Sequence, residues 1–333
     1  MSDSRLSLCL DEAGGFPPDG PILVLRPTQA ADLSALPRDR VNIVTGFRPD
    51  HDAFAARGYR VAADSDGLCA AGVLFLPRSK SFARALVALA MDHLPQGALL
   101  WIDGQKTDGI EPLWKDLRGR CDQVAAVTKS HGRCFAVRTD AAAVADWRAA
   151  PSEPVPGFIT RPGVFSADGI DAGSALLAAH LPHDLKGKGA DLGAGWGWLA
   201  AQTLAHPGVK RLHLVEAEAE ALTCARQNVS DERAAFHWAD ATTFAPGHTL
   251  DFVVMNPPFH TGRAAEPALG AAFIRSAARL LHPQGRLYMV ANRTLPYEEA
   301  LTASFRQVTP IATDGGFKLF VAAHPLKRQA DRV

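Results

Sequence analysis

Short β-like runs alternate with helical patterns along almost the whole chain, and this alternation restricts the possible folds more than any other feature. In the N-terminal half the candidate strands are ILVL (22–25), VNIV (41–44), GVLFL (72–76), ALLWI (98–102), QVAAV (123–127) and CFAV (134–137). In the C-terminal half they are GADLG (189–193), RLHLVE (211–216), AFHWA (235–239), DFVVMN (251–256), RLYMVA (286–291) and KLFVA (318–322). The candidate helices include 80–93, 108–117, 175–181, 197–205, 218–228, 267–281 and a helix near 297–305. Such alternation is typical of α/β proteins, in which mostly parallel, doubly wound sheets carry helices on both faces.

A proline-rich stretch separates the two halves of the chain. Residues 148–160 contain Pro151, Pro154 and Pro156 among small residues. Proline fixes φ and removes a backbone donor, so neither a long helix nor a central strand fits there. A chain of 333 residues is typical of about two domains. We therefore expect one domain over 1–147, a linker over 148–160 and a second domain over 161–333.

The two halves resemble each other in sequence. The matching segments are LPQGALLWIDGQK (94–106) with HPQGRLYMVANR (282–293), QVAAVTKSHGRCFAV (123–137) with QVTPIATDGGFKLFV (307–321), and GVLFLP (72–77) with DFVVMNP (251–257). Chance similarity between two α/β segments is the alternative, but the shared Pro-Gln-Gly turn followed by the same strand favours a duplication. The N-terminal copy has no glycine-rich turn after its first strand and has LPRS in place of NPPF. It is predicted to be a degenerate copy that kept the fold without the site.

The turn DLGAGWG (191–197) leads from a short apolar strand into a helix. Its glycines allow a ligand to approach the backbone closely, and the helix N-terminus offers free N–H groups. A nicotinamide-binding turn would read GxGxxG, whereas here the glycines alternate and Trp198 follows them. An acidic residue, Asp191, leads the motif, as in nucleoside-binding methyltransferases. We therefore assign Asp191, Gly193, Ala194 and Gly195 to a cofactor site, with Trp196 and Trp198 as candidate walls or as core residues.

Acidic residues also end the next two candidate strands. Glu216 ends the second strand, and its carboxylate can accept hydrogen bonds from both ribose hydroxyls. Asp240 follows the third strand, where it can accept from the adenine amino group. Either acid alone would be read as a solvated or capping residue. Because the carboxyl ends of these strands face one crevice, we expect Glu216 with Ala217, and Asp240 with Ala241, to contact the cofactor.

The motif NPPFH (256–260) follows the fourth strand and carries the predicted chemistry. An exocyclic or amide nitrogen is a poor nucleophile because its lone pair is delocalised. The Asn256 side-chain oxygen and the Pro257 carbonyl can accept hydrogen bonds from its two protons, which aims the lone pair, and the two prolines preorganise these acceptors. Phe259 can stack on a planar substrate. We predict that Asn256, Pro257 and Phe259 are catalytic and that Asn256 also contacts the cofactor. Pro258 and His260 are predicted to bind the substrate together with these three residues. The alternative is a proline-rich turn with a packed Phe259.

Composition excludes several classes of protein. Lys plus Arg equals Asp plus Glu at 35 each, so any nucleic acid must meet a local basic patch. The five cysteines form no CxxC pair, which argues against a disulfide framework or a zinc site. The N-terminus lacks the apolar core of a signal peptide, and the apolar helical stretch ALVALA is too short to span a bilayer. We expect a cytoplasmic monomer that uses no metal and binds no membrane.

These motifs, taken in order, resemble a known family: the bacterial ribosomal small-subunit RNA methyltransferases that modify the 2-amino group of guanine. The resemblance spans most of the chain and rests on PGVFSADGIDAGSALL (162–177), DLGAGWG, VEAEAEAL and NPPFHTG, which occur in the family's order. It implies two tandem Rossmann-like methyltransferase domains, the N-terminal one degenerate and serving RNA binding and folding. It also implies that the 162–177 segment, with Phe165, helps to close over S-adenosylmethionine.

The predicted activity is thus the transfer of a methyl group from S-adenosylmethionine to guanine N2 in small-subunit ribosomal RNA, either free or within the small ribosomal subunit. Loops of the NPPF type also serve adenine and glutamine methyltransferases, so the guanine rests on the resemblance. Two alternatives stay open at this point. One is a methyltransferase for another amine, such as adenine in nucleic acid or a protein glutamine. The other is an RNA-binding ribosome assembly factor.

Overall fold

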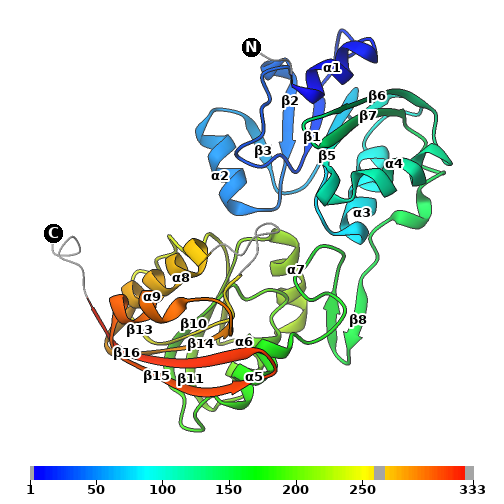
Figure 1. Ribbon diagram of the computed structural model, residues 1–333. Coiled ribbons are helices and arrows are strands. Elements are labelled where there is room, and N and C mark those ends of the chain that lie inside the picture. Colours follow the sequence, from blue (N-terminus) through cyan, green and yellow to red (C-terminus); the bar gives the residue numbers. More distant parts are fainter. Residues whose placement is uncertain (1–3, 259–266, 327–333) are drawn as a thin grey trace. The chain divides into compact units, whose positions relative to one another are not determined.

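The chain forms two compact units, each built around its own seven-stranded sheet (Figure 1). The computed structural model describes residues 4–258 and 267–326. The first unit consists of Met1–Pro151 with Arg161–Gly163, and the second of Ser152–Thr160 with Val164–Val333.

The N-terminal unit has its strands in the order β3-β2-β1-β4-β5-β7-β6. The strands are β1 (Ile22–Leu25), β2 (Val41–Val44), β3 (Arg60–Ala62), β4 (Ala71–Phe75), β5 (Leu99–Gln105), β6 (Gln123–Lys129) and β7 (Gly132–Arg138). The helices are α1 (Arg5–Glu12), α2 (Arg48–Ala56), α3 (Lys80–Asp92) and α4 (Ile110–Arg118), with short 3-10 turns η1 (Arg38–Arg40), η2 (Lys106–Asp108) and η3 (Ala145–Trp147). The first five strands pair in parallel, and β7 and β6 complete the sheet as antiparallel strands.

The C-terminal unit has its strands in the order β12-β11-β10-β13-β14-β16-β15. The strands are β10 (Lys186–Leu192), β11 (Gly208–Glu216), β12 (Ala234–Trp238), β13 (Leu250–Met255), β14 (Leu281–Asn292), β15 (Phe305–Asp314) and β16 (Phe317–Pro325). The helices are α5 (Ala172–Ala179), α6 (Trp198–Leu204), α7 (Ala219–Asn228), α8 (Pro267–Leu280) and α9 (Tyr297–Ser304). One apolar cluster joins Leu192 and Val215 of the sheet to α8 and α9, and another joins Leu212 and Leu214 to α5, α6 and α7 on the opposite face.

Counted from its own first strand, each sheet has the same strand order, because β10 to β16 repeat the arrangement of β1 to β7. Two doubly wound α/β units in tandem are therefore confirmed. The two sheets differ in which of their two central strands carries a glycine where these strands pair. In the N-terminal unit Leu23 of β1 lies beside Gly72 of β4, whereas in the C-terminal unit Gly189 of β10 lies beside Phe252 of β13. A Cβ atom on Gly189 would come within 2.2 Å of the Phe252 ring.

Part of the predicted linker is an ordered hairpin. Strands β8 (Ser152–Val155) and β9 (Phe158–Thr160) pair antiparallel around a turn in which Gly157 has a φ of 79°. Asn228, the last residue of α7, donates to the Ile159 and Trp196 carbonyls at 2.8 Å each and accepts from the Ile159 N–H at 2.7 Å. The proline-rich stretch is therefore bound to the C-terminal unit rather than extended between two domains.

Several elements differ from the sequence-based expectation. Helices α1 and α2 were not predicted; α2 buries only Phe54, so it has almost no apolar face to detect. Strand β15 was not predicted as a strand, since most of its side chains are exposed at the edge of the sheet. Among the described residues, no helix has both the length and the apolar character needed to cross a membrane.

Candidate active site

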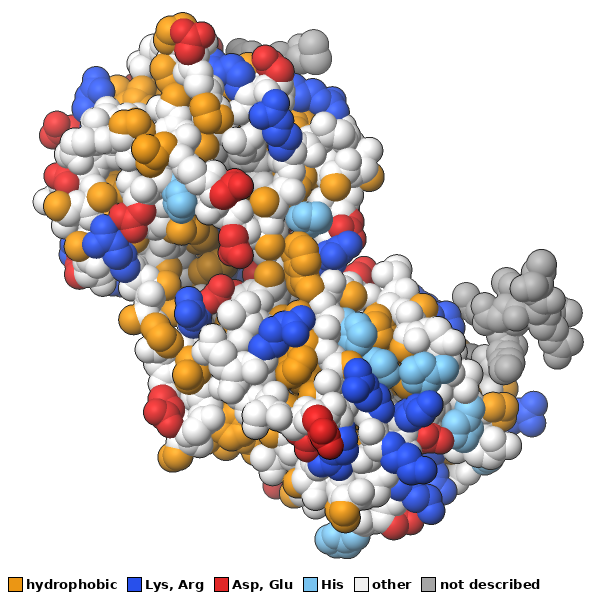
Figure 2. Space-filling model, turned by 180° about the vertical axis from the view of Figure 1, so that it is seen from behind, with side chains coloured by type: hydrophobic (Ala, Val, Ile, Leu, Met, Phe, Trp, Pro, Cys, Tyr) orange, Lys and Arg blue, Asp and Glu red, His pale blue; other side chains and the backbone are white. Residues whose placement is uncertain are grey.

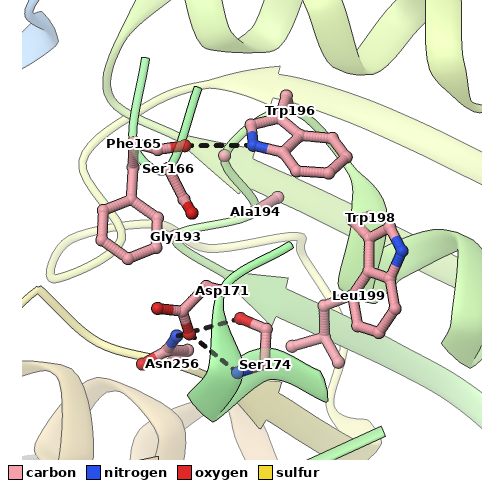
Figure 3. A pocket seen from close by; sticks show the side chains of 11 residues that line it. Phe165, Ser166, Asp171, Ser174, Gly193, Ala194, Trp196, Trp198, Leu199 and Asn256 are labelled. Carbon is pink, nitrogen blue, oxygen red and sulfur yellow. Dashed lines mark hydrogen bonds between the residues drawn. The ribbon is translucent and has the colours of Figure 1, made fainter. Parts of the chain in front are cut away.

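A pocket lies in the C-terminal unit where β10 and β13 end (Figure 3). The chain runs outward from β10 through β11 to β12 and returns with β13 on the other side of β10. In open α/β sheets such a change of direction leaves a crevice at the carboxyl ends of the strands, where ligands bind. The pocket is lined by Phe165, Ser166, Asp171, Ser174, Gly193, Ala194, Gly195, Trp196, Trp198, Leu199 and Asn256.

The glycine turn after β10 forms one wall of the pocket. Gly193, Gly195 and Gly197 have φ values of 80°, 55° and 90°, a region that side chains with a Cβ rarely adopt. The N–H groups of Gly193 and Ala194 donate to the Val215 carbonyl, which ties the turn to β11. Nothing lies within 4 Å of where a Cβ atom of Gly195 would be, so its backbone is open to a ligand.

Asp191 lies below this turn with only 1% of its surface exposed. Neither of its carboxylate oxygens has a hydrogen-bond partner among the described residues. Burial, and secondly the nearby Glu216 carboxylate, raise the pKa of Asp191 to about 8. A buried carboxyl without partners is unfavourable by itself, and it fits a ligand that brings positive charge or donors to the turn.

Glu216, at the end of β11, holds the turn from the side. Its carboxylate accepts from the N–H groups of Gly195 and Glu218, both at 2.8 Å. Burial raises the pKa of Glu216, while these backbone donors act in the opposite direction. Glu216 is therefore in contact with the glycine turn, as its predicted place at the second strand end requires.

The lining of this pocket does not include Asp191 or Glu216, nor the other predicted cofactor residues after β11 and β12. Asp240 uses Oδ1 to accept from the Thr242 N–H at 2.8 Å and from the Thr242 hydroxyl at 2.7 Å, so it holds its own turn. The Ala241 carbonyl accepts from the Ser276 hydroxyl, and the Ala217 carbonyl accepts from the Trp238 indole.

Asn256 faces the glycine turn from the end of β13. Its Nδ2 donates to Asp171 Oδ2 at 2.7 Å and lies 2.9 Å from Ser174 Oγ, as the dashed lines of Figure 3 show. Its Oδ1 is buried and has no partner among the described residues. The Asn256 side chain therefore has a buried oxygen that can accept a hydrogen bond from an N–H group of a ligand, such as an amine. Pro257 is buried and Pro258 exposed, while the predicted stacking residue Phe259 and its neighbour His260 lie outside the described residues.

The segment before α5 closes the opposite side of the pocket. The Phe165 carbonyl accepts from the Trp196 indole at 3.0 Å, and the Phe165 side chain is exposed. Phe165 was predicted for this place, and Trp196 and Trp198 both line the pocket. Ser166, Asp171, Ser174 and Leu199 also line the pocket but were not predicted, although the first three lie in the 162–177 segment on which the family resemblance rests.

Sequence comparisons match the chain to methyltransferases. The family model described as "Methyltransferase small domain" matches residues 156–321. A protein of Idiomarina loihiensis named "Ribosomal RNA small subunit methyltransferase C" is 30% identical over 97% of this chain and 99% of its own length. A protein of the same name from Sodalis glossinidius is 31% identical over 80% of this chain and 77% of its own length.

A solved structure matches nearly the whole chain. The 16S rRNA N2 G1207 methyltransferase of T. thermophilus, in complex with AdoMet and guanosine, superposes with a TM-score of 0.77 and 22% identity. The match covers 97% of this chain and 92% of that one, so the two-unit fold is shared along its full length.

Proposed function

Because this chain belongs to the ribosomal RNA small subunit methyltransferase C family, we propose that it transfers a methyl group from S-adenosylmethionine to the 2-amino group of a guanine in small-subunit ribosomal RNA. The observation that carries the proposal is the buried, unpartnered Oδ1 of Asn256 opposite the glycine turn. The T. thermophilus protein of the same fold was solved with AdoMet and guanosine, which supports guanine as the target base.

The cofactor-binding residues would come from the turn and the strand ends. We assign to this role Phe165, Asp191, Gly193, Ala194, Gly195, Glu216, Ala217, Asp240, Ala241 and Asn256. The unpartnered carboxyl of Asp191 fits a cationic cofactor, and the open backbone at Gly195 gives a ligand room. When bound, S-adenosylmethionine supplies an electrophilic methyl carbon: the amine lone pair forms the N–C bond, the C–S electron pair stays on sulfur, and the nitrogen releases one proton.

The residues after β13 would hold the amine by hydrogen bonds and orient its lone pair. Asn256 Oδ1 and the Pro257 carbonyl accept its two hydrogens, which directs the lone pair at the methyl carbon. These acceptors gain strength as positive charge develops on the nitrogen, so they stabilise the transition state more than the bound substrate. The target guanine is turned out of its stack to reach the pocket, with Phe259 as its stacking surface and Pro258 and His260 beside it.

We further propose that the enzyme acts in the cytoplasm as a monomer, and that this displacement needs no metal ion. All residues of the pocket come from one unit of one chain. The N-terminal domain would contribute to RNA binding and structure rather than to the chemistry.

Replacement of Asn256 by Ala tests the proposed role of the motif. The expected result is a fall of at least a hundredfold in the single-turnover rate of methylation of small-subunit ribosomal RNA, with little change in RNA affinity, since the variant cannot make a preorganised polar interaction with the transition state. Asn292→Ala is the matched control, because Asn292 ends the neighbouring strand β14 outside the pocket. Mass mapping of the RNA identifies the modified atom. A near-normal rate in Asn256→Ala would leave NPPF as a structural turn and favour the assembly-factor alternative.

A further inference from the structure

The two ends of the Asn256 amide have the same shape but opposite chemistry. The oxygen accepts hydrogen bonds and the NH₂ group donates them, so the end that faces the pocket decides whether the site accepts from an amine or repels it. A rotation of 180° about the last side-chain bond would exchange the two ends without any change in packing. The orientation must therefore be set by hydrogen-bond partners.

Those partners are Asp171 and Ser174, at the start of α5 and more than 80 residues earlier in the chain. The Asp171 carboxylate can only accept, and it lies 2.7 Å from Asn256 Nδ2. The opposite orientation would place the amide oxygen against this carboxylate, which is repulsive. The Ser174 hydroxyl supplies a second acceptor at 2.9 Å. Together they hold Nδ2 and leave Oδ1 as the buried end of the amide that has no partner among the described residues (Figure 3).

Asp171 is itself held in place by the first turn of α5. The same Oδ2 atom accepts from the Ser174 N–H at 2.8 Å, so Asp171 is the N-cap of the helix. A Cβ atom on Gly173 would lie 2.9 Å from the Phe317 ring and 3.1 Å from Asp171 Oδ2, which shows how closely this turn packs on the sheet. The carboxylate therefore has a defined position relative to β13.

We infer that Asp171, assisted by Ser174, is a positioning residue that fixes the amide orientation of Asn256 and so presents Oδ1 to the substrate amine. The inference rests on the proposed role of Asn256 and extends it to a second element. The negative charge of Asp171 also polarises the amide, which makes Oδ1 a better acceptor as the amine becomes positively charged.

An exchange of the two side chains separates this role from a structural one. Asn256→Asp alone places two carboxylates in hydrogen-bond contact and should lower the single-turnover rate at least a hundredfold. Asp171→Asn alone keeps an acceptor for the cap and for Asn256 but loses the charge, and should lower the rate severalfold. In the double variant, the new amide at position 171 can donate to the new carboxylate at position 256, which keeps an oxygen toward the pocket. The double variant should therefore be at least tenfold faster than Asn256→Asp.

Asp168→Asn is the matched control, since Asp168 is exposed in the same segment and its variant should keep the normal rate. Calorimetric titration with S-adenosylmethionine and thermal unfolding show whether each variant keeps its cofactor site and fold. A normal rate in Asp171→Asn together with no rescue in the double variant would overturn the inference. That outcome would leave the proposed function intact, because the latter fails only if the unaltered enzyme does not methylate guanine N2.

A different feature of the C-terminal unit carries a second inference. On the side of the C-terminal sheet that α8 covers, strands β10, β11 and β12 and the loop after them carry a group of Lys, Arg and His side chains that we call the basic sheet face: Lys186, Lys188, Arg211, His213, His237 and His248. Lys186, Lys188, Arg211 and His248 are exposed, His237 is half-buried and His213 is buried. Lys188 and Arg211 are directly opposite each other in the β10–β11 register and both are exposed. Figure 2 shows Lys, Arg and His side chains gathered in this way on the unit.

This arrangement is unfavourable without a partner. Like charges directly opposite on neighbouring strands destabilise a sheet, and within residues 4–258 and 267–326 no acidic side chain forms an ion pair with Lys188 or Arg211. The nearby Asp251 instead accepts from the Lys188 backbone and from His282. His213 lies 2.9 Å from His237, and burial, then its histidine neighbours and the two cations, lower the pKa of His213 to about 4. The local potential is therefore positive although the whole chain is neutral.

We propose that the basic sheet face binds the phosphate backbone of the substrate RNA. The test is the double charge reversal Lys188→Glu with Arg211→Glu, with the neutral pair Lys188→Gln and Arg211→Gln in case the reversal unfolds the protein. Affinity for naked small-subunit RNA should fall about tenfold, and the slope of log affinity against log salt should fall by about one for each phosphate that the variant no longer neutralises. Arg275→Glu with Arg306→Glu, exposed cations elsewhere on the unit, is the control.

S-adenosylmethionine affinity and the rate at saturating RNA should not change in these variants. Unchanged RNA affinity and salt slope would overturn this second inference. So would a loss seen only with assembled small subunits, because it would indicate a protein partner. Neither result would bear on guanine methylation itself.

Discussion

Two side chains at or next to the pocket keep polar oxygens buried and, within the part of the chain that the structure describes, without a hydrogen-bond partner. Asp191 has both carboxylate oxygens in this state, and Asn256 has its amide oxygen. A buried polar atom without a hydrogen bond costs roughly 1–3 kcal/mol, so these atoms weaken the free protein and become useful only when a ligand meets them. In the proposed function, Asp191 serves the cofactor and Asn256 the amine.

The raised pKa of Asp191 predicts how stability depends on pH. Its pKa is about 8 in the folded protein, against 3.8 as the ordinary value. At pH values between these two, Asp191 is protonated in the folded protein but ionised in the unfolded chain. The free energy of unfolding therefore falls as the pH rises from 4 toward 8, by up to about 1.4 kcal/mol per pH unit. Asp191→Asn should remove this contribution, so the difference in unfolding midpoint between the two proteins should widen from pH 5 to pH 8. Equal pH profiles in denaturant titrations would contradict the assignment.

The same carboxyl predicts a proton linked to cofactor binding. A cationic cofactor favours the ionised form of Asp191 and lowers its pKa, so binding near pH 7 should release up to one proton, and affinity should rise with pH toward 8. Calorimetric titration in two buffers of different ionisation enthalpy measures the released proton directly. Asp191→Asn should bind more weakly and release none. Proton release that persists in this variant would point to another group.

At the scale of elements, the β8–β9 hairpin is bound to the glycine turn, to which we assign the cofactor site. Asn228 connects Ile159 of the hairpin with Trp196 of the glycine turn through three hydrogen bonds. Trp196 in turn lines the pocket and packs edge to face on Phe158, with ring centroids 5.6 Å apart. The hairpin therefore supports the wall of the cofactor pocket from behind.

Asn228→Ala should therefore weaken both the fold of the C-terminal unit and its cofactor site. Removal of three hydrogen bonds predicts a decrease of about 2–3 kcal/mol in the free energy of unfolding, together with weaker binding of S-adenosylmethionine because Trp196 is less well held. Denaturant unfolding and calorimetry measure the two effects. Gln227→Ala, an exposed neighbour on the same helix, is the control and should change neither. A stable variant with normal cofactor affinity would show that the hairpin is a passive connection.

Most strands of the C-terminal unit and the residues at their ends could be predicted because short segments of the sequence determine them. Asp191 lies next to the last residue of β10, Glu216 ends β11 and Asn256 follows β13, each after an apolar stretch, and the glycine turn has its own spacing. The partners of these residues could not be predicted in the same way. Asp171 meets Asn256 across 85 residues of chain, and Asn228 meets Ile159 across 69, and neither contact leaves a periodic pattern in the sequence.

At the scale of the whole molecule, the two units share a strand order but not a site. The register places Leu25 of β1 where β10 has Asp191, and Leu76 follows β4 where Asn256 follows β13. Both leucines are buried in the core of the N-terminal unit. Apolar packing thus occupies the two positions at which the C-terminal unit keeps its unpartnered polar oxygens.

The full chain should therefore bind one molecule of S-adenosylmethionine rather than two. Gly195→Val should reduce this number to zero, because a branched side chain is strained at a φ of 55° and would fill the open space at the turn. Calorimetric stoichiometry measures both values. Residual binding of one cofactor in the variant would place a site in the N-terminal unit and contradict the degenerate-copy interpretation.

The two units carry a glycine on different central strands, Gly72 on β4 and Gly189 on β10, and this difference affects which strands can pair during folding. Two sheets of the same order in one polypeptide offer each other wrong strands during folding, and backbone hydrogen bonds cannot tell them apart. Side-chain size distinguishes them. Pairing of β1 with β13 would set Leu23 beside Phe252, whereas pairing of β10 with β4 would set Gly189 beside Gly72 without the Phe252 ring that fills the space over Gly189. The first mispairing would be overpacked and the second would leave a cavity, and each of these defects costs on the order of a few kcal/mol of stability. The Phe252 ring over Gly189 in one sheet, and the Leu94 and Leu100 side chains over Gly72 in the other, thus make the two central strand pairs sterically different, which favours pairing within each unit.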